Sequence, residues 1–365
     1  MPSSCCHGTY RYRYIAGILL TSFVILEVSC SQASYRHITH KPSIVTALGS
    51  GWIKVSQVGE PPARAGGAMT YDAATKMIVL FGGMYQMPRG GYLELHDTWL
   101  WNGVIWHQAH PPINPPIGLG ASMVYDPATR SVVLFGSVHG ETETWGWNGT
   151  TWKEYHTVQR PPPYSLWYPM VYDNKDHLVV LVQQHFSSAQ YGMWTWNGVT
   201  WKEHPAPLGM ELPGLAAMAY DQATGDVVLY GGPSPSKLLA HKLGISSSFV
   251  SLTWTWNGSI WLPHHTESYP SAYSSSTMVY DTAARVVVLF GGDTFNGHDP
   301  YPNSTWVWNG TTWKELRLAT SPSGRSEAQM AYDPVNKTIV LFGGERYNSH
   351  YLGDTWLLKL PGALP

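Results

Sequence analysis

The chain has 365 residues, of which 13% are charged, and its formal net charge is −2. This balance, without a run of Lys or Arg, gives no reason to expect a nucleic-acid partner. High counts of glycine (36), proline (27) and tryptophan (18) suit many short strands joined by tight turns rather than helices. All three cysteines lie within the first 30 residues, so the rest of the chain can form neither a disulfide nor a thiolate metal site.

The N-terminal segment has the pattern of an export signal. Arg11 and Arg13 precede an apolar run of about 12 residues, which is shorter than the roughly 18 to 20 that a membrane span needs. We expect residues 1–33 to be a signal peptide or a membrane or lipid anchor, with Cys30 as the lipid attachment point, and residues 34–50 to be a linker. An uncleaved signal anchor is the alternative. The protein is therefore expected to be secreted or held at the cell surface, with membrane contact only through this segment.

The rest of the sequence repeats one unit six times. Each copy opens with Met-x-Tyr-Asp and continues, eight residues after the tyrosine, with an apolar run that glycines close in most copies. The six tyrosines are Tyr71, Tyr125, Tyr172, Tyr220, Tyr280 and Tyr332. The third copy departs from the pattern, with Gln183 and Gln184 in place of the glycines. A repeat of roughly 50 residues built from short strands is typical of a propeller or a solenoid.

Each copy predicts four strands, which we call a to d in chain order. The Met-x-Tyr-Asp segment predicts strand a and the apolar run predicts strand b, while Trp-x-Trp-Asn-Gly-x-x-Trp predicts a hairpin of strands c and d. Asn-Gly favours a two-residue type I′ turn. In the first copy such a turn at 102–103 pairs Trp101 with Val104 and Trp99 with Trp106, with all three tryptophans on one face. We expect these tryptophans to pack between blades rather than to form an aromatic cage.

The last copy runs out of chain before it supplies a strand d. A matching segment lies at the other end of the repeat region, where Trp52 precedes Tyr71 by 19 residues, the same distance that separates Trp106 from Tyr125. We therefore predict that residues 51–56 form strand d of the last blade, which closes the ring and leaves no free sheet edge. The predicted fold is an all-β, six-bladed β-propeller of four-stranded blades.

The apolar strand, the paired glycines, the variable loop and the closing tryptophan resemble the kelch repeat family, which includes the propeller of galactose oxidase-like proteins. Arg64 and Arg325, which follow prolines at the start of strand a, belong to the same resemblance, which covers residues 51–360. The family contains enzymes, sugar binders and interaction modules, so the likeness implies a fold and no single activity. A galactose oxidase-type copper site needs a cysteine that the repeats lack, and we expect neither a cofactor nor a metal.

The connection between strands b and c is the part of the repeat that varies most in length, and variable loops on a rigid frame are where binding residues tend to lie. In a four-stranded blade the b–c and d–a loops share one face, around the mouth of the central channel. Each b–c loop holds one histidine; a metal ring is the alternative to solvated side chains. The candidate ligand-binding residues are Arg64, Trp167, Arg325, Glu327, Glu345, His96, His298 and His350.

Three of these candidates have a second interpretation. Arg64 and Arg325 are suited to clamp a carboxylate through two hydrogen bonds each, but the resemblance also allows them a structural role as bridges. Trp167 is suited to stack on a sugar ring, or to fill a blade whose usual glycines are missing.

Three functions follow from this pattern. The expected one is a monomeric binding module for a protein, peptide or glycan at the loop face. The alternative is a carbohydrate-active enzyme that resembles the six-bladed kelch mutarotases of acidic sugars, in which Arg64 and Arg325 would act with Glu327 or Glu345 on a carboxylated sugar. A purely structural surface protein is the third.

Overall fold

The computed structural model describes residues 44–45, 51–55, 59–87, 90–163, 168–184, 191–204, 216–231, 253–272, 274–294, 300–346 and 350–362. By compactness the chain separates into Met1–Thr39 and His40–Pro365, and all described residues belong to the second unit. Strands are the only regular elements of these residues, so none of their segments is a helix that could cross a membrane.

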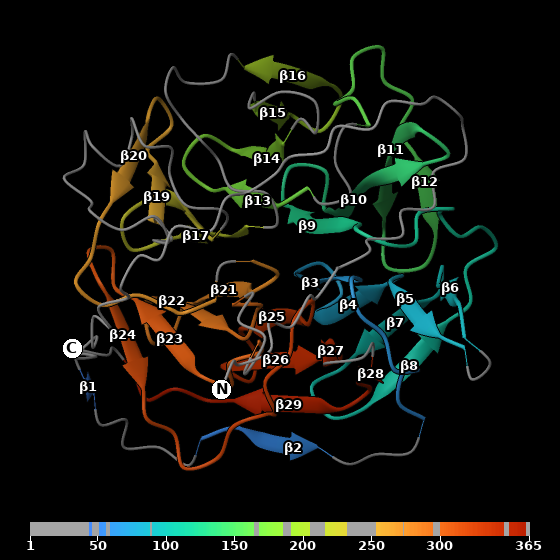
Figure 1. Cartoon of the computed structure of the whole chain (residues 1–365). Helices are drawn as coiled ribbons and strands as arrows, with labels where there is room; N and C mark the ends of the chain where they lie inside the picture. The colour runs from blue at the N-terminus through green and yellow to red at the C-terminus, as the bar shows by residue number, and fades with distance from the viewer. Residues whose placement is uncertain are drawn as a thin grey trace, which may run out of the picture. The chain divides into compact units, whose positions relative to one another are not determined.

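Six of the sheets are antiparallel blades of four sequence-repeated strands around a common centre (Figure 1). Two short hairpins form sheets of their own, namely β5 (Met84–Gln86) with β6 (Tyr92–Glu94) and β27 (Glu345–Arg346) with β28 (His350–Tyr351). In each blade the Met-x-Tyr-Asp strand is innermost, and strands b, c and d follow outward. Blades 1 to 3 consist of β3 (Ala68–Asp72), β4 (Met77–Phe81), β7 (Thr98–Trp101) and β8 (Trp106–Ala109); β9 (Ser122–Asp126), β10 (Ser131–Val138), β11 (Glu141–Trp147) and β12 (Trp152–Glu154); and β13 (Met170–Asp173), β14 (Leu178–Gln184), β15 (Tyr191–Trp196) and β16 (Trp201–His204).

Blades 4 to 6 follow the same plan. They consist of β17 (Ala217–Asp221), β18 (Asp226–Tyr230), β19 (Thr253–Trp256) and β20 (Trp261–His264); β21 (Thr277–Asp281), β22 (Val286–Phe290), β23 (Thr305–Trp308) and β24 (Trp313–Leu316); and β25 (Gln329–Asp333), β26 (Thr338–Phe342), β29 (Thr355–Leu358) and β2 (Ile53–Val55). Short β1 (Ile44–Val45), within the predicted linker, adds to blade 5 as a fifth strand parallel to β24. The fold is the predicted six-bladed β-propeller.

The core lies between the blades. Strand b is apolar on both faces because each face packs against a neighbouring blade; Val79, Leu80 and Phe81 of β4 are all fully buried. Six clusters of buried side chains result, each shared by two adjacent blades around the whole ring. Tryptophans of strands c and d take part in every cluster, as the sequence predicts.

The ring closes where the sequence predicts. Strand β2 pairs antiparallel with β29, with Ile53 opposite Leu357 and Val55 opposite Thr355. Trp52 is 1% exposed and belongs to the cluster shared by blades 5 and 6. Residues from the two ends of the repeat region therefore complete one sheet.

The predicted register of the c–d hairpin is wrong by two residues. Trp101 lies opposite Trp106, and their ring centroids are 5.4 Å apart. The side-chain oxygen of Asn102 accepts hydrogen bonds from the backbone N–H groups of Val104 and Ile105, both at 2.9 Å, and so holds a four-residue turn instead of a type I′ turn. Because a slip of two residues keeps each side chain on its face, the predicted packing face of the tryptophans is still correct.

Neighbouring blades are also joined by a repeated hydrogen bond. The indole N–H of the strand-d tryptophan donates to the hydroxyl of the threonine directly before the first strand-c tryptophan of the preceding blade, at 2.7–3.0 Å. The donors and acceptors are Trp52 and Thr305, Trp106 and Thr355, Trp152 and Thr98, Trp201 and Thr144, and Trp313 and Thr253. At the sixth interface the threonine is replaced by Met193, and the buried Nε1 of Trp261 has no hydrogen-bond partner among the described residues.

Candidate functional site

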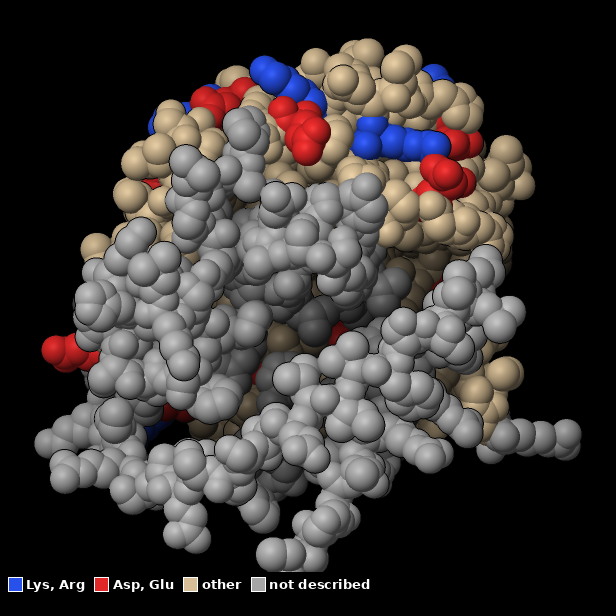
Figure 2. All heavy atoms as spheres, turned by 45° about the horizontal axis from the view of Figure 1, so that its top comes forward, with Lys and Arg blue, Asp and Glu red and all other residues tan. Residues whose placement is uncertain are grey.

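The central channel opens on the b–c face into a cavity of about 200 Å³. It is lined by the N-terminal ends of the inner strands of all six blades, including Gly66, Tyr168, Ser275, Glu327 and Gln329. Pockets for drug-sized ligands span about 300–1,000 Å³, so the described part of this cavity suits one small chemical unit. In the space-filling view charged side chains of both signs are interspersed on the surface, and acidic atoms are visible inside the central hollow (Figure 2).

A chain of three backbone hydrogen bonds joins four blades along the wall of this cavity. The residues that form these bonds all stand five residues before the strand-a tyrosine of their blade. The backbone N–H of Glu327 donates to the carbonyl of Ser275 at 3.0 Å, and the backbone N–H of Gly66 donates to the carbonyl of Glu327 at 3.1 Å. The backbone N–H of Gly120 donates to the carbonyl of Gly66, also at 3.1 Å. All four residues have positive φ, which is +65° for Gly66 and +54° for Glu327. Glycine adopts this conformation freely, whereas a glutamate is strained by about 1 kcal/mol or more.

Glu327 is the chemically unusual residue of the site. Its side chain lines the cavity, but its Oε2 atom is buried and has no hydrogen-bond partner among the described residues. Burial, together with the negative charges of Glu345 and Asp293, raises the pKa of Glu327 to about 8. The carboxyl group is therefore mostly protonated at neutral pH, and strain and a perturbed pKa coincide at one cavity-lining residue, as they do in functional sites.

The acids around Glu327 come from the b–c connections. Glu345 begins β27 (Glu345–Arg346), which pairs with β28 (His350–Tyr351), and an isolated bridge joins Glu345 to Ser326. An equivalent bridge joins Asp293 to Ser274 in blade 5. Burial and the charge of Asp293 raise the pKa of Glu345 as well. These bridges bring the b–c and d–a connections together, so that carboxyl groups distant in the sequence act on one another.

Two tyrosines complete this acidic cluster. Burial and the charges of Glu345 and Asp293 raise the pKa of Tyr301 to about 12, and burial and Glu345 also raise the pKa of Tyr351. Both phenols stay protonated across the physiological range and offer hydroxyl groups. Tyr351 also meets the ring of Tyr92 edge-on, with centroids 6.3 Å apart. Tyr92 belongs to β6 (Tyr92–Glu94), which pairs with β5 (Met84–Gln86) in blade 1, so hairpins of two blades meet beside the cluster.

Gln329 provides a second unsatisfied group on the cavity wall. It is 5% exposed, and its side-chain nitrogen donates to the carbonyl of Glu327 at 2.6 Å. Its side-chain oxygen is buried and accepts no hydrogen bond from the described residues. Glu327 and Gln329 therefore each keep one buried side-chain oxygen without a hydrogen-bond partner among the described residues.

Both predicted arginines are engaged within the protein. Arg64 is fully buried and binds Asp97 through two hydrogen bonds of 2.6 and 2.9 Å, with further bonds to the carbonyls of Gly82 and Pro62. Burial raises the pKa of Asp97, but the hydrogen bonds and charge of Arg64 outweigh it and hold that pKa below its usual value. The guanidinium donors of Arg64 are therefore used within the protein, and they join the start of strand a to the residue before strand c.

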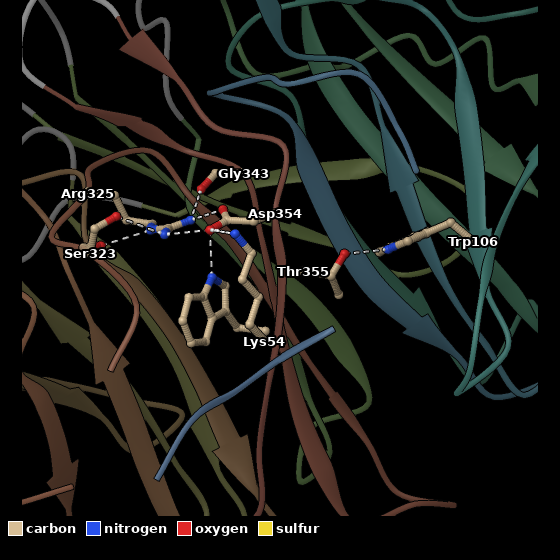
Figure 3. A network of polar contacts seen from close by, with 8 residues as sticks. Lys54, Trp106, Ser323, Arg325, Gly343, Asp354 and Thr355 are labelled. Carbon is tan, nitrogen blue, oxygen red and sulfur yellow. Dashed lines mark hydrogen bonds and ion pairs between the residues drawn. The ribbon is translucent and has the colours of Figure 1, made fainter. Parts of the chain in front are cut away.

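Arg325 makes the corresponding contacts in blade 6 (Figure 3). Its guanidinium donates to Asp354 at 2.6 and 3.3 Å, to the carbonyl of Gly343 at 2.9 Å and to the carbonyl and hydroxyl of Ser323. The carboxylate of Asp354 also accepts from Trp356 at 2.7 Å and lies 3.7 Å from the Lys54 ammonium. The structure thus gives both arginines the bridging geometry that was the alternative to ligand binding.

The structure describes two of the three predicted site histidines, and they have different surroundings. The ring of His96 lies 3.1 Å from the carbonyl of Ile117, whereas His350 is exposed in β28. His139 is exposed at the β10–β11 turn. His298 and Trp167, the remaining predicted site residues, lie outside the described residues. Within the described ranges, no group of three His, Cys, Asp or Glu side chains is placed to hold a metal ion.

A second cavity, of about 420 Å³, occupies the opposite end of the channel. Six methionines line both cavities and so lie between them, namely Met69, Met123, Met170, Met218, Met278 and Met330. Five of the six strand-a tyrosines, all but Tyr125, line the second cavity. The pKa of each of the six is raised by burial and, in part, by the aspartate of the preceding blade. Burial and the charge of Asp333, for example, raise the pKa of Tyr71. This end therefore presents neutral phenols over an apolar constriction, in contrast to the acidic mouth.

Sequence comparison identifies no relative, since neither a family model nor a curated protein matches the chain. Solved structures do match it. The structure titled "Structure of YjhT" is similar with a TM-score of 0.58 and 11% identity, covering 84% of this chain and 97% of that one. The SapL1 lectin in complex with alpha methyl fucoside matches with a TM-score of 0.50 and 15% identity, covering 85% of this chain and 100% of the lectin. At these identities the likeness shows the fold alone.

The sequence named Glu327 and Glu345 but missed Asp293, Gln329, Tyr301 and Tyr351. A signal for the strained site was present, because the repeat position of Glu327 is occupied by Gly66 and Gly120 in two other copies. The arginine partners could also have been found, since Asp97 and Asp354 both stand two residues before a strand-c tryptophan.

Proposed function

We propose that this protein is an extracytoplasmic kelch-repeat propeller that binds a glycan, with one sugar unit held in the cavity at the b–c mouth of the channel. The observation that carries the proposal is the cavity of about 200 Å³ at this mouth, which has the polar residues Ser275, Glu327 and Gln329 in its lining. A fucoside-bound lectin among the structures of the same fold supports a glycan as the ligand class.

The binding proposal is tested by calorimetric titration of the purified protein with a panel of monosaccharides, after a glycan array has selected the panel. The Gln329→Ala variant, which introduces the residue found at the same repeat position in Ala68 and Ala217, should weaken binding by about tenfold without loss of the fold. Val335→Ser is the matched control, because Val335 is 61% exposed in the a–b turn of the same blade, away from the mouth. Equal affinity of Gln329→Ala and the native protein would refute the assignment of the site.

A second candidate is an enzyme that interconverts the anomers of a sugar. It is favoured by one observation, that Glu327 and Glu345 are neighbouring carboxyl groups and that the pKa of Glu327 is raised to about 8. A pair of acids with different protonation states can divide the roles of general acid and general base. Because Arg64 and Arg325 are occupied by Asp97 and Asp354, an acidic sugar is not the favoured substrate. NMR detection of anomer exchange that Glu327→Gln abolishes would support the enzyme, and binding without exchange would support the lectin-like module.

The location of the protein is part of the proposal. It rests on Arg11, Arg13 and the apolar run that follows them, which have the order of an export signal. Cell fractionation, with mass spectrometry of the mature N-terminus and of any lipid on Cys30, distinguishes a secreted, a lipid-anchored and an uncleaved form. Recovery of the full-length chain in the cytoplasm would contradict export.

A further inference from the structure

We infer that the cavity at the a–b end of the channel, where the turns between strands a and b lie, is a second ligand site. Its ligand would be a neutral aromatic compound with a hydrogen-bonding head group. The cavity has a volume of about 420 Å³, within the range of about 300–1,000 Å³ that is typical of sites for small organic ligands. The inference does not depend on the proposed function, because the described linings of the two cavities share only the six strand-a methionines.

The inner part of this cavity is largely apolar. Its floor is formed by the strand-a methionines, and five strand-a tyrosines contribute to its wall. The hydroxyl of Tyr332 accepts a hydrogen bond at 3.3 Å from the backbone N–H of Ala283 in the preceding blade, and Tyr220 and Tyr280 make the equivalent contact. These hydroxyl groups are thus bound to the frame of the propeller. Thioethers and phenol rings both make favourable contacts with an aromatic ring, so the inner part suits the ring of a ligand.

The rim of the cavity is polar on one side only. The residue after the strand-a aspartate forms this rim, and it is Asn174, Gln222 and Thr282 in the consecutive blades 3 to 5. Blades 6 and 1 have Pro334 and Ala73 there, and all five rim residues are exposed. The side-chain amides of Asn174 and Gln222 have no hydrogen-bond partner among the described residues. Each amide offers donors and an acceptor, so this side of the rim suits the head group of a ligand.

The charge of the lining favours a neutral head group. No Asp, Glu, Lys, Arg or His lines this cavity in the described part of the chain. The strand-a aspartates are buried and are bound to their own a–b turns; Asp333, for example, accepts from the backbone N–H groups of Val335 and Asn336. A carboxylate or an ammonium group that left water for this site would lose hydration without gaining a counter-charge in the lining.

A sugar fits this cavity less well than an aromatic compound does. Sugar hydroxyl groups surround the whole ring, so several of them would lie against methionine and phenol side chains without hydrogen-bond partners. A flat aromatic ring places only C–H groups against this floor and wall, and its single polar substituent can reach Asn174 and Gln222 at the rim. The two ends of the channel therefore suit different ligands.

The test measures the binding of three probes to the full-length protein near pH 7 by equilibrium dialysis. Naphthalene-2-carboxamide is neutral, whereas naphthalene-2-carboxylate and 2-naphthylmethylammonium carry the same rings with opposite charges. We expect the carboxamide to bind about tenfold or more tightly than either charged probe. The double variant Asn174→Ala with Gln222→Ala should weaken binding of the carboxamide by about tenfold.

Two further variants show whether the effect belongs to the rim. Gln222→Glu keeps the shape of the side chain and adds a negative charge, so it should reverse the preference in favour of the ammonium probe. This gain of binding cannot arise from a folding defect. Val335→Ala is the matched control, because Val335 is 61% exposed and follows Pro334 but does not line the cavity. It should bind the carboxamide as the native protein does.

Four results would overturn the inference. The first is failure of all three probes to bind, and the second is binding of a charged probe that equals or exceeds that of the carboxamide. The third is unchanged affinity of the double variant together with unchanged selectivity of Gln222→Glu, since the probe would then bind elsewhere. The fourth is a loss of affinity in Val335→Ala as large as that in the double variant. None of these results bears on glycan binding at the b–c mouth, which the sugar titration tests separately.

Discussion

Removal of the carboxyl group at Glu327 should stabilise the protein at neutral and alkaline pH. In the unfolded chain this group ionises near its ordinary pKa of 4.5, whereas in the fold its pKa is about 8. Between these values the unfolded state holds fewer protons than the folded state, so the contribution of Glu327 to stability falls as the pH rises and becomes constant above about pH 8. At 1.36 kcal/mol per pKa unit, the total loss is about 4–5 kcal/mol at most.

The assay is chemical denaturation followed by tryptophan fluorescence, for the native protein and Glu327→Gln, at intervals from about pH 5 to about pH 9. The difference between the two profiles isolates Glu327, because all other titrating groups are common to both. We expect the variant to equal the native protein near pH 5 and to exceed it by several kcal/mol near pH 9. Parallel profiles would refute the conclusion that Glu327 is buried without a counter-charge.

The Glu327→Gly variant distinguishes the effect of backbone strain on stability from the effect of the carboxyl charge. Residue 327 has a φ of +54°, and the equivalent residues of two other blades are Gly66 and Gly120. Glycine at position 327 should relieve the backbone strain, so Glu327→Gly should be more stable than Glu327→Gln by about 0.5–1 kcal/mol at every pH. A glycine variant less stable than the glutamine variant would show that the left-handed backbone is not strained.

Three further predictions concern the frame of the propeller. Met193→Thr should be more stable than the equally shaped Met193→Val by about 1 kcal/mol in thermal unfolding, because the hydroxyl would accept the hydrogen bond that Trp261 lacks; equal stabilities would contradict that geometry. Arg64→Met should cost about 3–5 kcal/mol because it leaves Asp97 without its buried partner, and the double variant with Asp97→Leu should recover most of the loss; no recovery would argue against the buried pair. Trp52→Ala should cost about 3–5 kcal/mol and broaden the unfolding transition by loosening the seam, whereas a change below about 1 kcal/mol would show that closure does not depend on this side chain.

The architecture could be predicted because the same strand pattern occurs in all six copies of the repeat with nearly constant spacing. The interval between Trp52 and Tyr71 equals that between other strand-d tryptophans and the next tyrosine, so the partner of the last blade was identifiable without coordinates. The register of the c–d hairpin was not, because the same Asn-Gly pair fits two turns. The side chain of Asn102 decides between them by capping the longer turn.

The functional site was predictable only in part. Arg64 and Arg325 attracted a ligand-binding hypothesis because a free guanidinium suits a carboxylate. The shared position of Asp97 and Asp354, two residues before a strand-c tryptophan, was a signal that both arginines already have partners, but only the structure shows the hydrogen bonds. Glu327 was named for its position beside Arg325. Its importance depends instead on burial and on the charges of neighbours that are not adjacent in the sequence.

The sequence alone determined the number of blades, the order of strands and the closure of the ring, since each follows from local periodicity and fixed spacing. Only the tertiary structure decided which acids meet. Glu327 and Glu345 come from the d–a and b–c connections of blade 6 and Asp293 comes from blade 5, and their mutual influence depends on the distances at which the closed ring holds them. Electrostatic coupling and desolvation act through space, so the protonation of the site is a property of the fold.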